Sequence, residues 1–144
     1  MEYYDIDVYE RRVTTSSPEA QMWFNRGLVW TNAYFHDEAV ACFRRALEAD
    51  PECAMAPWGV AYAAGPNYPR PGERRDAKRR ADTAETCHSA TRVALALSAK
   101  VTPFERAMIE AVPSRFPQRT PEDLEVMRGW NDDYANAMRG VYEA

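Results

Sequence analysis

Histidine and cysteine are the residues in this sequence whose types could support catalysis or metal binding. His36 and His88 are the only histidines, and about fifty residues separate them. Cys87 and His88 are adjacent, so on a helix their side chains would point roughly 100° apart and could not easily hold one ion. A metal site or a Cys–His nucleophile pair would have to be assembled from several elements, and no motif supports either. We therefore expect no metal and no cofactor.

The acidic residues and the glycines give no catalytic pattern either. Glu122-Asp123 and Asp132-Asp133 are adjacent acids on expected helix surfaces, where such residues are usually solvated and do not converge on a substrate. The run GPNYPRPG at residues 65–72 matches no phosphate-binding loop. We therefore predict that the protein is not an enzyme.

Residues 20–51 have the clearest helical pattern in the chain. Trp23, Gly27 and Trp30 recur at steps of four and three residues, which places them on one face of a helix. Asp37 is expected to cap a second helix, because its carboxylate can accept from free N–H groups of the first turn. That helix should end at Asp50-Pro51, since the residue before a proline is pushed out of helical geometry.

Small residues should let these two helices approach closely. Gly27 and Ala46 have little or no side chain, and we expect Trp23, Trp30 and Phe43 to fill the space around them. The other helices follow from start signals and periodicity. Their expected starts are Ser17, Ala54 or Met55, Glu73, Thr102 with Glu105 as a capping box, and Thr120-Pro121. The helix from Glu73 should run to about Val101, and residues 1–16 should form an extended arm lying across helices. We favour a simple packed N-terminal extension; the alternative is an arm that occupies a groove or binds a second copy.

Composition narrows the class of protein. The chain has 144 residues, of which 46% are hydrophobic and 28% charged, so it can bury a core and is globular. A net charge of -4 does not favour nucleic-acid or membrane-surface binding, and no apolar run approaches the roughly 20 residues that cross a bilayer. Three cysteines without C-x-x-C spacing and no secretion signal indicate a cytoplasmic protein.

Residues 20–51 resemble one tetratricopeptide repeat, which pairs two antiparallel helices in about 34 residues. The positions that match the repeat are Trp23, Gly27, Trp30, Ala39, Phe43, Ala46 and Pro51. Arg26 and His36 depart from it, because leucine and tyrosine are usual there. The segments TTSSPEAQMWFNRGLVW, CAMAPWGVAYAAGPNYPRPG and VTPFERAMIEAVPSRFP are also similar to the opening of a group of long bacterial tetratricopeptide proteins of unassigned activity.

The resemblance implies a single all-α, tetratricopeptide-like domain of about six helices over residues 1–144. Its parts would be the arm (1–16), repeat one (17–53), repeat two (54–102) with an insertion at 65–72, and repeat three (103–144). The third repeat would be either complete or truncated.

The same resemblance implies a concave groove lined by the first helix of each repeat. The residues that would bind a peptide or partner there are Phe24, Asn25, Leu28, Asn32, Trp58 and Tyr62, with Tyr68 on the insertion. Asparagine side chains can hold an extended peptide backbone, and aromatic side chains supply burial. The alternative is that the apolar members of this set are simply core between packed helices.

The last expected helix keeps an apolar side. Its residues are Trp130, Tyr134, Met138, Val141 and Tyr142. A repeat array needs a polar terminal helix, so these residues should pack against further repeats of a longer array or against a second copy in a homodimer.

We therefore expect a protein–protein interaction scaffold that binds a protein or peptide partner and neither nucleic acid nor membrane. The alternative is an accessory domain of a biosynthetic or enzymatic system. It would bind a small molecule or metal near the Pro-rich loop, with Tyr68, Trp58 and His36 involved. The sequence identifies no particular partner, ligand or pathway.

Overall fold

The computed structural model describes residues 3–67, 71, 76–121 and 123–144 of the chain. Its helices, in chain order, are α1 (Pro18–Asn32), α2 (His36–Ala49), α3 (Met55–Ala64), α4 (Ala77–Leu97), α5 (Pro103–Ala111) and α6 (Leu124–Glu143). The short 3-10 turns η2 (Ser98–Lys100) and η3 (Val112–Arg115) follow α4 and α5. Within these residues there are six α-helices and no strand, so the predicted all-α class is confirmed.

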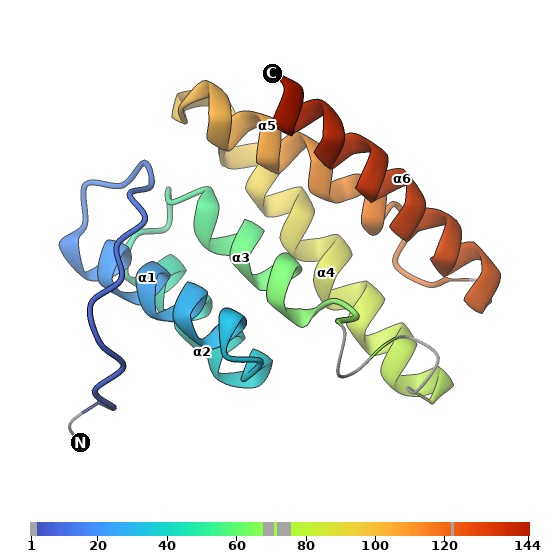
Figure 1. The fold of residues 1–144 in the computed structure, drawn as a ribbon, viewed down its shortest axis with the longest axis horizontal. Helices are drawn as coiled ribbons and strands as arrows, with labels where there is room; N and C mark the ends of the chain where they lie inside the picture. Colours follow the sequence, from blue (N-terminus) through green and yellow to red (C-terminus); the bar gives the residue numbers. More distant parts are fainter. Residues whose placement is uncertain (1–2, 68–70, 72–75, 122) are drawn as a thin grey trace.

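The helices pack mainly against their neighbours in the sequence. α1 packs on α2, α2 on α3, α3 on α4, and α5 on α6. Contacts also join α1 to α3 and α3 to α5, so these three helices share one side of the molecule. Figure 1 shows α1 and α2 at one end and α4, α5 and α6 side by side at the other, with α3 between them.

The centre of the α1–α2–α3 unit is the ring of Phe43, which is fully buried. A Cβ atom added to Gly27 of α1 would lie 2.6 Å from Cε1 of this ring, and one added to Gly59 of α3 would lie 2.4 Å from Cδ1. These distances are shorter than carbon atoms tolerate, so the ring requires glycine on both sides. The prediction that Gly27 and Ala46 allow a close approach around Phe43 holds, and Ala46 is fully buried.

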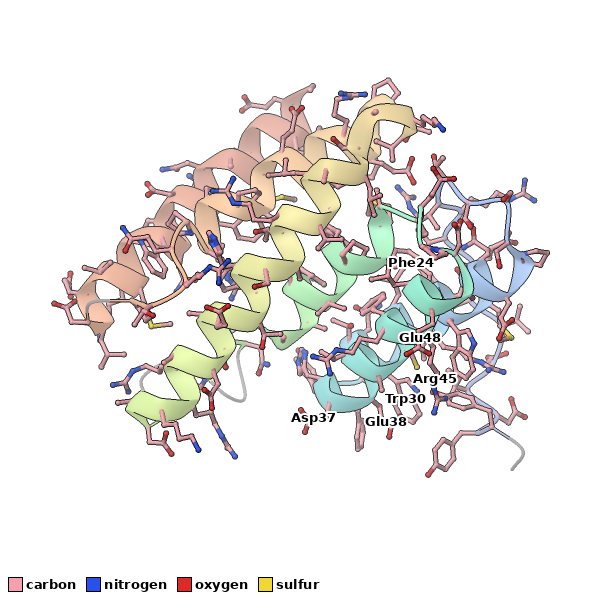
Figure 2. All side chains as sticks on the ribbon, turned by 180° about the vertical axis from the view of Figure 1, so that it is seen from behind. Phe24, Trp30, Asp37, Glu38, Arg45 and Glu48 are labelled. Carbon is pink, nitrogen blue, oxygen red and sulfur yellow. The ribbon has the colours of Figure 1, made fainter. Side chains whose placement is uncertain are left out.

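The prediction for the two tryptophans was only partly right. Trp23 and Trp30 pack against the edge of the core and are half-buried, but the ring that fills the space at Gly27 belongs to Phe43. In Figure 2, Trp30 lies on the same side of the α1–α2 pair as Arg45 and the start of the arm, away from Phe24. Tyr3 of the arm packs against both tryptophans on that side: its ring meets Trp23 edge to face, and its hydroxyl accepts from Nε1 of Trp30.

Two helix starts were predicted correctly from their capping residues. Ser17 accepts a hydrogen bond from the Ala20 amide, and Thr102 forms the complete capping box with Glu105. Two others were wrong. Asp37 does not cap α2, because that helix already begins at His36, and α6 is capped by Asp123 rather than opening at Thr120.

The long helix α4 is shorter than predicted. It begins at Ala77, where the Asp76 side chain accepts from the Arg79 amide, and it ends at Leu97 before the turn η2. The expected start at Glu73 lies outside the described residues. Half of the insertion 65–72, including Tyr68, also lies outside the described residues. Gly65 to Asn67 follow the end of α3 and are not helical, as predicted.

Residues 3–16 form the expected arm, with neither helix nor strand. The arm runs beside α1 at one end of the molecule (Figure 1). Over the part of the chain that the structure describes, no helix combines the length and the apolar character that a membrane span requires.

Candidate functional site

A cavity of about 520 Å³ lies on the side that α1, α3 and α5 share, and the arm crosses it. Its helical lining is mostly apolar, and the arm adds basic and hydroxyl groups. The lining residues are Phe24 and Leu28 of α1; Met55 and Trp58 of α3; Thr102, Phe104, Glu105 and Met108 at α5; and Tyr9, Arg11, Arg12, Val13 and Thr14 of the arm. We call this site the α1–α3–α5 groove.

Some of the residues predicted for a groove do meet here. Phe24 and Trp58 are 1% and 4% exposed, and Leu28 is half-buried beside them, so all three form part of the floor and also belong to the core. The sequence left open whether these apolar side chains line a groove or fill the core, and in the structure they do both. Asn25 does not line this cavity; it accepts from the Arg11 N–H and lines a separate cavity of about 220 Å³ beside residues 6–9 of the arm.

The arm backbone is held along α1 by two amide side chains. The Arg11 N–H donates to Oδ1 of Asn25 at 3.1 Å, and the Arg11 carbonyl accepts from Nε2 of Gln21 at 2.8 Å. Oε1 of Gln21 accepts from the Val13 N–H at 3.0 Å. The two amides also bond to each other, with Gln21 donating to Asn25 at 2.9 Å. An extended segment is thus recognised through its main chain, without regard to side-chain identity.

Glu105 fastens the other side of the arm to α5. Its carboxylate accepts from both the N–H and the hydroxyl of Thr14 at 2.6 Å, and from the N–H and hydroxyl of Thr102 at 2.9 and 2.8 Å. Burial on its own raises the pKa of Glu105, but the hydrogen bonds from Thr14 and Thr102 stabilise the charged form more, so the pKa falls below its ordinary value. Glu105 therefore stays ionised although it is buried.

Further contacts fix both ends of the arm. The Thr15 hydroxyl donates to the Asp50 carboxylate, and the Arg11 guanidinium lies 5.1 Å from the Phe104 ring centre. At the N-terminal end, the hydroxyl of Tyr3 accepts from Nε1 of Trp30 and lies 3.1 Å from Sγ of Cys42. Burial, together with the Cys42 contact, raises the pKa of Tyr3 to about 12, so this hydroxyl stays protonated at neutral pH.

A second, smaller cavity of about 290 Å³ lies on the other side of the stacked Trp58 and Tyr62 rings. Its lining is polar and contains Asn32 and Tyr62, which were predicted for the groove, and His36, which was predicted for a ligand site. The full lining is Thr31, Asn32, Tyr34, His36, Tyr62, Pro66, Asn67 and Arg115. The predicted set is therefore divided among these two cavities and the one that Asn25 lines, and Tyr68 lies outside the described residues.

Arg115 supplies the charge of the second cavity. Its Nε donates to Oδ1 of Asn131 at 3.1 Å, and one terminal nitrogen donates to the Pro66 carbonyl. Its guanidinium also lies 5.6 Å from the Tyr134 ring centre. Burial lowers the pKa of Arg115, and no carboxylate among the described residues forms an ion pair with it. A half-buried cation thus borders a polar space.

The cysteines and histidines form no reactive group. Sγ of Cys87 donates to the Ala61 carbonyl at 3.6 Å, whereas Nδ1 of His88 lies 2.8 Å from the Phe116 carbonyl, so the adjacent pair serves two different neighbours. Burial raises the pKa of the Cys42 and Cys53 thiols, which keeps them protonated. Across the described residues, no three His, Cys, Asp or Glu side chains gather as metal ligands would.

The residues predicted for self-association are not one exposed face. Trp130 is only 8% exposed, and Tyr134 is half-buried beside Arg115. Met138 and Val141 are also half-buried, whereas Tyr142 is 93% exposed. Tyr142 is therefore the member of the set that is free to contact another molecule.

Sequence reasoning missed three residues that matter in these sites. Gln21 precedes Asn25 by four positions, a helical spacing that could have paired the two amides. Glu105 was recognised only as half of a capping box. Arg115 lies in a turn where its type and neighbours give no local signal.

Comparison with known proteins identifies no relative. No protein-family model, no curated protein and no solved structure matches this chain. The fold and the site define an all-α protein whose helices pack consecutively and whose groove is covered by the arm. Its function is inferred from its own geometry.

Proposed function

We propose that the protein is a protein–protein interaction scaffold that binds an extended segment of a partner in the α1–α3–α5 groove. The tetratricopeptide resemblance supports this proposal, because α1, α3 and α5 would be the first helices of repeats 17–53, 54–102 and 103–144. In that architecture the first helices line the concave, peptide-binding side.

The observation that carries the proposal is the way Gln21 and Asn25 hold main-chain groups beside an apolar floor. Three hydrogen bonds to alternate residues of an extended chain, with Phe24 and Trp58 beneath it, combine affinity from the backbone with burial of side chains. On this proposal the protein binds and does not catalyse, and it needs no cofactor. Its buried thiols are consistent with a reducing cytoplasm.

Selection from a displayed library of random short peptides against the full-length chain tests the proposal. Selected peptides should shift the amide NMR signals of residues around the groove and lose about tenfold in affinity in Met108→Ala, because this change removes part of an apolar wall of the groove. The matched control is Gln118→Ala, because Gln118 is exposed on the α5–α6 connection. Peptides that bind equally to wild type and Met108→Ala, or that shift signals elsewhere, contradict the proposal.

A second candidate function is small-ligand binding in the polar cavity near the Pro-rich loop. The observation that favours it is Arg115, which has no carboxylate partner among the described residues and faces amide and hydroxyl groups of Asn32 and Tyr62. This lining suits a small organic carboxylate or inorganic phosphate. Titration with acetate, succinate and phosphate, followed by NMR, should shift Tyr62 and Asn32 in wild type but not in Arg115→Gln. Unchanged spectra in wild type would remove this candidate.

A further inference from the structure

We infer that the arm is an internal occupant of the α1–α3–α5 groove which the partner displaces, and that the partner segment carries a bulky apolar residue directly followed by serine or threonine. This inference rests on the proposed function, since it specifies the partner of the same groove. It starts from what the arm already does there.

The arm and a partner segment would compete for the same hydrogen-bonding groups. Oε1 and Nε2 of Gln21, and Oδ1 of Asn25, are engaged by the arm or by each other. A second extended chain could therefore not pair with α1 while residues 11–13 remain in place. Binding in this manner requires the arm to leave.

Polar contacts hold the arm more than apolar burial does. Val8 is 93% exposed, Tyr9 to Arg12 are exposed, and Val13 is the half-buried apolar residue of the stretch that crosses the groove. Water can replace hydrogen bonds when the arm departs, so each contributes a modest net stability to the attached state. Apolar burial, the larger source of stability, is small for this segment.

The arm also leaves much of the groove unfilled. A cavity of about 520 Å³ remains with the arm in place, and Leu28, Met55 and Met108 are among its apolar walls. Val13 is the arm residue whose N–H pairs with Gln21, and its side chain is short. A leucine, methionine or phenylalanine at this position could reach further into the cavity and bury more surface.

Glu105 selects the next residue of the occupant. It is buried and ionised, and it receives one N–H and one hydroxyl from Thr14. An occupant with an apolar residue here would leave a buried carboxylate with one donor fewer, which is costly. An acidic residue would place two negative charges together. The hydroxyl of serine or threonine fits without either cost.

The first experiment uses the full-length chain without any peptide. Val13→Leu should raise the Tm by a few degrees because the longer side chain fills space in the groove. The matched control is Val8→Leu on the same arm, which should leave the Tm unchanged because Val8 is exposed. A lower Tm for Val13→Leu would refute the claim that the groove has unfilled space next to Val13.

The second experiment adds a synthetic peptide of residues 9–16 that carries the Val13→Leu change and a fluorescent label. Thr14→Val in the full-length chain removes a hydroxyl that holds the arm. Hydrogen exchange at the Arg11 and Val13 amides should become faster in this variant, and the labelled peptide should bind it about tenfold more tightly than wild type. The same peptide with Thr14→Val should bind weakly to both proteins.

The outcomes separate this inference from the proposed function. If the arm is released but no peptide binds, the groove does not accept peptides and the proposed function fails. If the peptide binds both proteins equally while the arm amides stay protected, the groove binds peptides but the arm is no competitor. Arm amides that are equally protected in Thr14→Val and wild type overturn the inference as well.

Discussion

Replacement of Gly27 by alanine tests the packing on which the fold depends. The new Cβ would lie 2.6 to 2.7 Å from three atoms of the Phe43 ring. The ring has no route of escape, because it is fully buried and its other side meets Gly59. We therefore expect strain in α1, a shift of the whole helix, or both.

The magnitude follows from two opposing effects. Overpacking of a close-packed core costs about 1–3 kcal/mol. Alanine is a better helix former than glycine by about 1 kcal/mol, which offsets part of that cost. Gly27→Ala should thus destabilise the chain by up to about 2 kcal/mol, or up to about 6 °C in Tm for a domain of this size.

The chain offers a matched control on α6. A Cβ added to Gly129 or Gly140 would meet no atom within 4 Å, so Gly129→Ala should stabilise through helix propensity alone by about 0.5–1 kcal/mol. Thermal and urea unfolding of both variants give the comparison. Phe43→Leu should reduce the cost of Gly27→Ala, because the ring atoms it meets are gone. Equal gains in stability from Gly27→Ala and Gly129→Ala would refute the reasoning.

Three further predictions concern the arm and the last helix. Glu105 has a folded-state pKa below the ordinary value of about 4.3, so its stabilising effect is present above that value and is lost as pH falls through the folded pKa. The difference in Tm between wild type and Glu105→Gln, measured from pH 7 to pH 3, should therefore shrink in acid; a constant difference would contradict this. Tyr3→Phe should lower stability by about 1 kcal/mol in urea unfolding, since Trp30 loses its acceptor, and an unchanged midpoint would count against the arm contact. If the last helix mediates dimers, Tyr142→Glu should reduce the mass measured by light scattering without changing the Tm, whereas a wild type that is monomeric at all concentrations removes that prediction.

Local signals in the sequence predicted much of the fold. Ser17 and Thr102 cap their helices as expected, because their bonds involve only residues three positions away. Asp37 failed because the N-cap of α2 is Phe35, two residues earlier, after a turn in which Tyr34 has a φ of 65°. Such a turn depends on how α1 and α2 meet, which no short window of sequence contains.

The groove was predictable only in part for the same reason. The tetratricopeptide resemblance implied that Phe24, Leu28 and Trp58 would face one groove, and these three side chains do line one cavity. The Thr14–Glu105 bond joins residues 91 positions apart. Only the packing of α1, α3 and α5 brings them together, and Glu105 alone reads as a capping residue. Long-range contacts therefore define what the arm does, and short-range patterns define where it can lie.

Phe43 connects the stability of the fold to the shape of the groove, although it does not line the groove. Its ring lies between Gly27 and Gly59, so its thickness sets how close α1 and α3 can come. Phe24 lies 5.4 Å from the Phe43 ring centre to centre, and Trp58 adjoins Gly59 in sequence. The floor of the groove is thus positioned from behind by one side chain of α2. On the proposed function, a substitution at Phe43 should alter peptide binding by changing the separation of α1 and α3, although it changes none of the residues that line the groove.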